Sequence, residues 1–274
     1  MMEDIQSITI LGGHSKSGEA EDVALRLVPG DLVAVVGPTG SGKSRLLADI
    51  EYIAQRDTPS GRCILINDQP PAPEIRFDMG RKLIAQLSQN MNFVMDATVA
   101  EFITLHAECR DTNLGETGLE ELIHSVVTQA NRLTGEPIVP DTPLTALSGG
   151  QSRSLMIADT AILSDSPIVL IDEIENAGID RRQALDILVQ NQKIVLMATH
   201  DPILALLAHS RIVLKSGGIA DVLESDQDES ALLEELQKAD AAILAVREKL
   251  RRGERLAGSA FNYAELAANG ILEA

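Results

Sequence analysis

The segment Gly37-Pro-Thr-Gly-Ser-Gly-Lys-Ser44 has the residue types that a phosphate-binding loop needs. It fits the pattern G-x-x-x-x-G-K-[ST] and lies between an apolar run, Leu32–Val36, and a helical pattern that starts at Lys43. Glycines leave backbone N–H groups open to wrap phosphates at a helix N-terminus. We expect Lys43 to reach the β- and γ-phosphates and Ser44 to bind Mg²⁺. The predicted nucleotide-binding residues are Gly37, Pro38, Thr39, Gly40, Ser41, Gly42, Lys43 and Ser44.

A second candidate group follows the apolar run Ile168–Ile171, which ends in Asp172 and Glu173. A buried parallel strand places such acids at the carboxyl edge of its sheet, where ligands of open α/β folds bind. We expect Asp172 to hold the magnesium, through water, and Glu173 to orient or deprotonate the attacking water.

The third motif, Leu147-Ser-Gly-Gly-Gln151, precedes the acidic strand and starts a helical pattern. Its Ser148 hydroxyl and the N–H groups of Gly149 and Gly150 would form an anion cradle. With these motifs, residues 5–222 resemble the ATP-binding cassette (ABC) ATPases. The resemblance implies that Ser148, Gly149, Gly150 and Gln151 close over the γ-phosphate that a second subunit holds. ATP and Mg²⁺ are therefore the expected cofactors, and a head-to-tail homodimer, or a pair with a related cassette subunit, is the expected assembly.

The same resemblance assigns three more residues. Gln89 matches the glutamine that senses magnesium and water, with Gln86 as the alternative. His200 matches the switch histidine that contacts the γ-phosphate. Asp180 matches the D-loop aspartate, although the segment after Glu173 is one residue longer than usual. Two other features depart from the family. Ser154 and Asp159 stand where arginine is frequent, and no aromatic residue stands where adenine is stacked, although His14 falls near that place.

The elements that position these motifs predict an α/β fold with a parallel sheet, an antiparallel β edge and a helical insertion. The resemblance implies that this is a P-loop NTPase with an ABC-type mixed sheet, whose insertion is the helical signature subdomain. Ile5–Leu11 is expected to be an exposed edge strand, paired antiparallel with Asp22–Val28. We expect an ATPase domain over 1–224, with helices inserted at about 90–150, and a helical extension over 225–274. Thr98 and Glu101 predict a capping box at the start of the insertion. Further strands are expected at 63–66, 82–87, 168–171, 194–198 and 212–214, and helices at 43–55, 118–133, 149–163, 180–191 and 202–208.

The extension has apolar residues spaced 4-3-4-3-4, namely Leu232, Leu236, Ala239, Ile243, Val246 and Leu250. We expect a helix packed on its own domain from this spacing, and the alternative is a helix that docks a partner or dimerises.

The composition limits the partners. A net charge of −18 disfavours nucleic acid, and Cys63 and Cys109 lack metal-ligand or disulfide spacing, which is typical of reduced thiols. No apolar run reaches the ~18 residues of a membrane span.

Three roles remain open at this stage. The first is the energy-coupling subunit of a transporter whose permease is a separate chain; residues 92–103 resemble the region that transport cassettes present to a permease. The second is a soluble cassette in metallocluster assembly or enzyme activation, which the run Asp172-Glu-Ile-Glu175 favours. The third, a DNA-repair cassette, is disfavoured by the acidic charge and by the absence of a long insertion. A cytoplasmic protein, peripheral at the inner membrane face through its permease, is expected for the first role.

Overall fold

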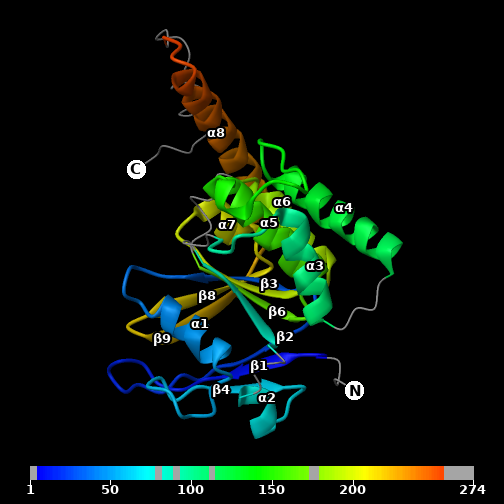
Figure 1. Cartoon of the computed structure of the whole chain (residues 1–274). Helices are drawn as coiled ribbons and strands as arrows, with labels where there is room; N and C mark the ends of the chain where they lie inside the picture. The colour runs from blue at the N-terminus through cyan, green and yellow to red at the C-terminus, as the bar shows by residue number, and fades with distance from the viewer. Residues whose placement is uncertain (1–4, 78–81, 89–92, 111–114, 173–178, 256–274) are drawn as a thin grey trace. The chain divides into compact units, whose positions relative to one another are not determined.

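A six-stranded sheet is the centre of the first of two units into which the chain divides, Met1–Glu224 and Ser225–Ala274. The computed structural model describes residues 5–77, 82–88, 93–110, 115–172 and 179–255. The strand order is β5 (Ile84–Leu87), β6 (Ile168–Asp172), β7 (Ile194–Ala198), β3 (Leu32–Val36), β8 (Ser210–Lys215) and β9 (Gly218–Glu224) (Figure 1). The first five strands are parallel, and β9 pairs antiparallel with β8. Their runs of Ile, Val and Leu suit strands covered on both faces.

A second sheet has three antiparallel strands in the order β2 (Ala24–Leu27), β1 (Ile8–Leu11) and β4 (Cys63–Ile66). The predicted pairing of the first two strands is confirmed, with Ile8 opposite Leu27. The prediction that the first strand lies exposed at an edge is wrong, because β4 pairs with its other side and makes β1 the central strand. Ile8 and Ile10 are accordingly fully buried.

Helices cover both faces of the large sheet. Helix α1 (Lys43–Glu51) contributes Leu46, Leu47 and Ile50 to a core shared by the two sheets. The opposite face is covered by α5 (Gly149–Ile162), α6 (Arg181–Gln190) and α7 (Pro202–Leu207). The short α2 (Pro73–Phe77) follows β4. The large sheet therefore lies between two layers, which leaves its strand ends to form a site.

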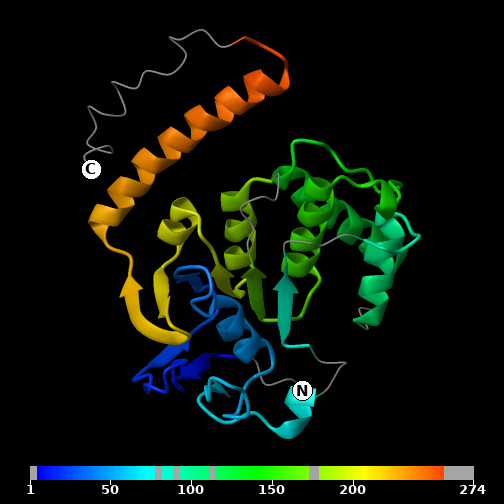
Figure 2. The same ribbon diagram turned by 90° about the vertical axis from the view of Figure 1, so that its left-hand side faces the viewer.

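A group of helices lies between β5 and α5 in the sequence: α3 (Val99–Cys109), α4 (Glu116–Leu133) and the 3₁₀ helix η1 (Leu144–Ala146). Figure 2 shows α3 and α4 on the side of the sheet where β5 lies. They share a separate apolar core with α5, which includes Ile103, Val126 and Leu155. The predicted capping box starts α3, because the Glu101 N–H donates to Thr98 Oγ1 at 3.2 Å and the Thr98 N–H donates to Glu101 Oε2 at 2.7 Å.

The described part of the second unit, residues 225–255, forms the long helix α8 (Gln227–Arg251). Within the described part of the chain, no helix is both long and apolar enough to cross a membrane. Cys63 and Cys109 are both free thiols.

Candidate functional site

The loop from Gly37 to Gly42 joins β3 to α1, in the position that the phosphate-loop motif requires. Gly37, Gly40 and Gly42 have φ values of 149°, 77° and 108°, which side-chain-bearing residues rarely adopt. A Cβ on Gly37 would also lie 2.5 Å from the Leu214 carbonyl oxygen, and one on Gly42 would lie 2.9 Å from Gly217 Cα. Conformation and crowding therefore both require glycine at these two positions.

The loop and helix α1 suit a bound anion. Lys43 folds back so that its Nζ donates to the carbonyl oxygens of Gly37 at 2.8 Å and Pro38 at 3.4 Å. No side chain caps the N-terminus of α1, and its first turn has no acidic residue. Ser41 Oγ is buried and has no hydrogen-bond partner among the described residues. An anion at this end of α1 would meet backbone N–H groups and the positive end of the helix dipole.

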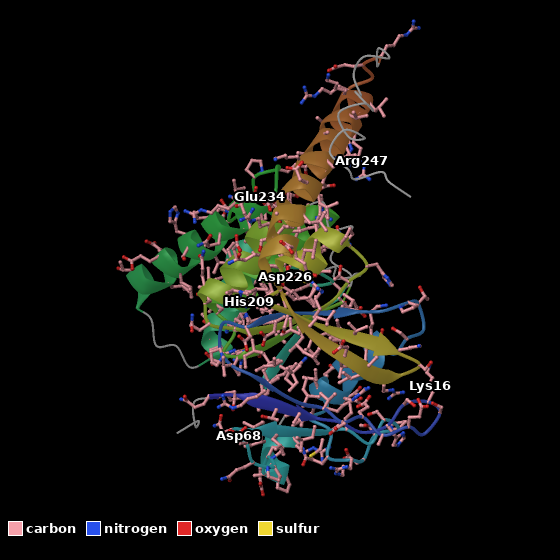
Figure 3. All side chains as sticks on the ribbon, turned by 180° about the vertical axis from the view of Figure 1, so that it is seen from behind. Lys16, Asp68, His209, Asp226, Glu234 and Arg247 are labelled. Atoms are coloured by element: carbon pink, nitrogen blue, oxygen red, sulfur yellow. The ribbon has the colours of Figure 1, made fainter. Side chains whose placement is uncertain are left out.

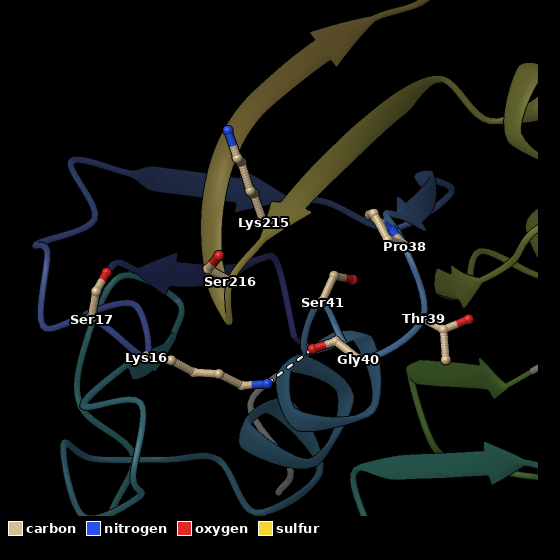
Figure 4. A pocket seen from close by; sticks show the side chains of 8 residues that line it. All are labelled: Lys16, Ser17, Pro38, Thr39, Gly40, Ser41, Lys215 and Ser216. Atoms are coloured by element: carbon tan, nitrogen blue, oxygen red, sulfur yellow. Dashed lines mark hydrogen bonds between the residues drawn. The ribbon is translucent and has the colours of Figure 1, made fainter.

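A cavity of about 590 Å³ opens beside this loop. Figure 4 shows three segments around it: the loop after β1, the phosphate loop and the hairpin between β8 and β9. Lys16 Nζ donates to the Gly40 carbonyl oxygen at 2.9 Å, which joins the first segment to the second. The lining residues are Lys16, Ser17, Pro38, Thr39, Gly40, Ser41, Lys215 and Ser216.

The cavity walls were only partly predicted. Lys16, Ser17, Lys215 and Ser216 belong to no motif, and only their nearness to His14 or to the last predicted strand pointed toward them. His14 itself is exposed and does not line the cavity. The lining residues are lysines, serines and small residues without an aromatic ring. With Lys43 they place positive charge around the loop in a chain whose net charge is −18, which favours a polyphosphate.

The sheet order places Asp172 and His200 at the same edge as the phosphate loop. Strand β7 lies between β6 and β3; Asp172 pairs with Ala198, and Ala198 pairs with Val35. His200 follows the end of β7 and is exposed. Asp172, His200 and the phosphate loop therefore occupy the carboxyl ends of three adjacent strands, as predicted from the motifs.

Fixed neighbours hold the segment that carries His200. The Thr199 N–H donates to the Val35 carbonyl oxygen at 3.3 Å. The Asp201 N–H donates to Thr199 Oγ1 at 2.9 Å. The Asp201 carboxylate caps α7 and forms an ion pair with Arg181. The backbone on both sides of His200 is thus anchored, while the imidazole stays open to solvent.

The signature residues form the N-terminus of α5. Ser148 Oγ accepts a hydrogen bond from the Gln151 N–H at 3.3 Å, and Gln151 Oε1 accepts one from the Ser148 N–H at 2.9 Å. Gly149 is exposed, and apart from its chain neighbours and its own helix backbone no described atom lies within 4 Å of where a Cβ would be. None of Ser148, Gly149, Gly150 or Gln151 lines the cavity beside the phosphate loop.

Of three other predicted site residues, the structure describes one, Asp180. Asp180 is the N-cap of α6, where its carboxylate accepts hydrogen bonds from the Gln183 N–H at 3.0 Å and Nε2 at 2.9 Å. Gln89 and Glu173 lie outside the described residues, directly after the segments of β5 and β6.

A fully buried arginine, Arg62, links the segments that form the cavity walls. The sequence motifs did not reveal it. Arg62 Nη1 donates to Asp49 Oδ2 of α1 at 2.9 Å, and its Nε donates to Glu21 Oε2 at 3.0 Å. Its Nη2 donates to the carbonyl oxygen of Gly217 at 2.8 Å. Gly217 in turn donates its N–H to the Ser41 carbonyl oxygen at 2.8 Å. Arg62 thereby connects all three segments around the cavity.

Glu21 is held as a carboxylate in this network. Burial raises the pKa of Glu21, but hydrogen bonds from Arg62 and from the backbone N–H groups of Gly13 and Ile219, together with the Arg62 charge, bring the pKa below its ordinary value of 4.5. The charge of the buried arginine is therefore balanced by the Glu21 carboxylate, which stays ionised at neutral pH.

Comparison with known proteins agrees with this geometry. The family model described as "ABC transporter" matches residues 20–176. An uncharacterised ABC transporter ATP-binding protein of Methanocaldococcus jannaschii is 52% identical over 254 residues, which are 92% of this chain and 95% of that protein. The chain belongs to the ABC transporter family. The predicted activity, that of an ATP-hydrolysing ABC ATPase that binds ATP, is confirmed at the level of this family.

More distant ABC proteins share the fold. A methionine import ATP-binding protein of Chlamydia abortus is 26% identical, over 78% of this chain and 64% of its own length. The structure of cbiO1 from Clostridium perfringens, described as part of the ABC transporter complex cbiONQ, matches with a TM-score of 0.58 and 23% identity, over 91% of this chain and 97% of cbiO1. A bacterial Atm1-family ABC exporter with ATP bound matches with a TM-score of 0.57 and 19% identity, over 88% of this chain and 43% of the exporter chain. The predicted α/β fold is confirmed.

Proposed function

We propose that this ABC ATPase binds MgATP in a head-to-tail dimer and uses its hydrolysis to drive a membrane transporter. The cavity beside the phosphate loop carries the proposal. It combines an uncapped helix N-terminus, the buried Lys43 and the cationic Lys16 and Lys215 in an otherwise acidic chain. The triphosphate would bind along residues 37–44, with its base and ribose toward Lys16 and the β8–β9 hairpin.

The donor set fits a magnesium ion bound with ATP. Ser44 is exposed in the first turn of α1, and Asp172 ends β6 two strands away from the phosphate loop. Hydroxyl and carboxylate oxygens are ligands that Mg²⁺ accepts, and with a nucleotide it needs only one or two of them from the protein. No cluster of three or more His, Cys, Asp or Glu side chains in the described ranges could hold a metal alone. When bound, the ion would neutralise phosphate charge; Gln89 is the third proposed contact.

The proposed reaction assigns one task to each remaining group. Glu173, directly after Asp172, orients the attacking water and accepts its proton. His200 donates a hydrogen bond to the γ-phosphate from its anchored segment, and Lys43 balances its charge. These roles extend the sequence-based assignment and rest on the shared sheet edge.

The place of the signature residues supports the proposed dimer. Since Ser148 does not line the cavity of its own chain, we propose that it covers the nucleotide of a second copy, with Asp180 near the same interface. Each composite site would then contain the phosphate loop of one chain and the α5 N-terminus of the other.

A mixing experiment tests this arrangement. Lys43→Ala inactivates the phosphate loop, and Ser148→Arg blocks the lid, so each variant alone should hydrolyse ATP poorly. Mixing them should restore about a quarter of the wild-type rate, because about half of randomly formed pairs are mixed and each mixed pair keeps one intact site of two. A mixture that stays as inactive as its components would contradict composite sites. Lys43→Ala mixed with itself is the control.

We further propose that the start of α3 docks the permease. A groove of about 470 Å³ is lined there by Met95, Asp96, Ala97, Ala100, Glu101, Thr104, Leu105 and Glu108. Val94 beside it is 98% exposed and Leu105 46% exposed. Exposed apolar side chains among carboxylates fit a short helix with apolar and basic residues. The permease origin of that helix is supported by the relatives, which are described as ATP-binding proteins of transporters.

Affinity capture from detergent-solubilised membranes of the source cell tests this docking. The wild-type chain should retain a multi-spanning protein, and Val94→Asp with Leu105→Asp should lose it. Val139→Asp is the matched control, because Val139 is also exposed but lies outside the groove. Retention of soluble partners alone would instead favour a role in assembly or enzyme activation.

A further inference from the structure

One side of helix α8 carries six regularly spaced apolar residues, here called the seam, and their spacing is the same in both directions along the helix. Leu232, Ile243 and Leu250 of this seam are 46%, 41% and 56% exposed. The remaining members are Leu236, Ala239 and Val246, so the seam repeats at intervals of four and three residues. Read from either end the order of intervals is the same. A second α8 that runs in the opposite direction would therefore meet this seam with its own.

The charges of α8 are divided between its ends. Residues 226–235 contain five acidic and no basic residues: Asp226, Asp228, Glu229, Glu234 and Glu235. Residues 247–255 contain five basic residues, Arg247, Lys249, Arg251, Arg252 and Arg255, and two acidic ones. Figure 3 labels Asp226 directly before the helix, Glu234 on its first half and Arg247 toward its other end. Two parallel copies would place like charges together, whereas two antiparallel copies place opposite charges together.

We propose that α8 pairs antiparallel with the α8 of a second copy of this chain. With the pair centred on Ala241, Leu232 faces Leu250 of the second copy, Leu236 faces Val246, and Ala239 faces Ile243. Each layer occurs twice by symmetry. The small Ala239 opposite the larger Ile243 gives the alternation that knobs-into-holes packing requires.

The same register pairs charges on one flank of the seam. Glu235 and Lys249 directly precede seam residues and lie beside each other across the two copies. In the single chain, Glu235 already contacts Lys238 at 2.5 Å and is still accessible. Asp240 on the other flank would face the Asp240 of the second copy. Like charges there weaken the pair, so Asp240→Asn is expected to tighten it.

This contact rests on the proposed head-to-tail dimer but is distinct from it. The nucleotide sandwich needs ATP, whereas an α8 pair forms without it. A helix of 25 residues gives fewer than four heptads, so the free pair should be weak. Once two chains are held together at α8, the second contact becomes intramolecular and gains effective concentration. The α8 pair would thus keep two cassettes together while ATP is absent.

Sedimentation of the full-length, nucleotide-free chain provides the main test. We expect a reversible monomer–dimer equilibrium whose dissociation constant is no higher than about 100 μM. Ile243→Gln removes two seam layers and should weaken the dimer on the order of 100-fold. Leu244→Gln is the matched control, because Leu244 is 49% exposed and neighbours Ile243 but lies outside the seam. Its dissociation constant should stay within about threefold of wild type. Circular dichroism checks that α8 stays helical.

Cysteine pairs test the direction. In a Cys109→Ser background, Leu236→Cys chains mixed with Val246→Cys chains should form interchain disulfides, while either variant alone should not. In an antiparallel pair, identical positions lie ten residues apart along the helix, roughly 15 Å. Disulfides in each variant alone would show parallel pairing and overturn the proposal.

Charge reversal tests the register. Glu235→Lys should weaken the dimer about tenfold, and adding Lys249→Glu should restore it. Glu234→Lys, on the outer side of the helix, should have little effect.

The outcomes separate the two dimers. A wild-type chain that stays monomeric without nucleotide, while Glu173→Gln dimerises with ATP, overturns α8 pairing and leaves the sandwich standing. An α8 dimer without any ATP-dependent dimer contradicts the sandwich. If Ile243→Gln lowers the unfolding temperature of a monomer, the seam packs within its own chain and the proposal fails.

Discussion

The guanidinium of Arg62 donates a hydrogen bond of 2.8 Å to the carbonyl oxygen of Gly217, a residue from the opposite side of the cavity wall. Arg62 also forms ion pairs with Glu21 and Asp49, and its side chain is completely buried. A buried guanidinium is tolerated only when its donors are satisfied and its charge is balanced. Arg62 therefore fixes the relative positions of the β1–β2 loop, α1 and the β8–β9 hairpin.

Replacing Arg62 by methionine should destabilise the chain by about 3–5 kcal/mol, because two buried carboxylates lose their counter-charge. The free energy of unfolding in urea measures the change. Arg26→Met is the matched control, since the Arg26–Asp68 pair is more than half exposed and its loss should cost less than about 1 kcal/mol. An equal loss of unfolding free energy in the two variants would mean that the buried ion pairs of Arg62 stabilise the fold no more than an exposed pair does.

Arg62→Lys separates positioning from stability. Lysine keeps the charge but cannot reach Glu21, Asp49 and Gly217 together, since it lacks the planar fork of arginine. We expect a folded protein whose KM for ATP rises severalfold while kcat changes little, because the cavity walls shift but the sheet edge with Asp172 does not. A lower kcat at unchanged KM would contradict a role at the nucleotide wall.

Stability should depend on pH through Glu21. Its pKa in the folded chain lies below the ordinary value of 4.5, so the carboxylate stabilises the fold fully above that value. As the pH falls below it, the unfolded chain takes up the proton first, and the stabilisation is lost as the pH passes through the folded-state pKa. Glu21→Gln should be less stable at pH 7 and lose less on acidification. Urea unfolding between pH 7 and pH 3 measures this, with the exposed Glu19→Gln as control.

Lys43→Ala should lower the affinity for ATP at least about tenfold, because it removes the cation that folds over the phosphate loop at 2.8 Å from the Gly37 carbonyl oxygen. Isothermal titration with MgATP gives the affinity. Arg45→Ala removes an exposed charge from the same helix and should bind ATP nearly as wild type does. Unchanged affinity in Lys43→Ala would contradict the assignment of the loop.

Glu173→Gln should bind ATP but turn over at least about 100-fold more slowly, because glutamine cannot accept the proton of the attacking water. The uncleaved nucleotide should then hold the two chains together, which light scattering with and without MgATP would detect. Turnover at the wild-type rate would remove Glu173 from its proposed role.

Much of the fold could be predicted because the motifs and buried strands carry strong local signals. The apolar runs Leu32–Val36 and Ile194–Ala198 are strands as expected, and their parallel order alone brings Asp172 and His200 to the phosphate loop. The capping box at Thr98 was also visible, because its two partners are only three residues apart.

What could not be predicted depends on contacts between distant segments. Ile5–Leu11 has mixed alternation, and only its pairing with β4 as well as β2 makes it a central strand. The strand β9 was missed because alternating Gly218–Glu224 is stabilised by its hairpin partner β8 rather than by its own pattern. Arg62 is charged, and nothing local distinguishes a buried arginine from an exposed one. The contacts by which Arg62 supports the cavity walls could therefore not be predicted from the sequence.

Strand β7 lies between β6 and β3 and therefore sets the distance across the sheet between the groups at the ends of these two strands. Interstrand spacing separates Asp172 from the phosphate loop by two strand widths, roughly 10 Å, and side-chain changes alone cannot alter that length. A one-residue insertion or deletion in Ile194–Ala198 would shift His200 along the strand by about 3.3 Å. It would also exchange the side chains that pack in the two cores on opposite faces of the sheet. Nucleotide chemistry should therefore be lost when the length of this strand changes, even though none of its fully buried residues contacts the nucleotide site directly.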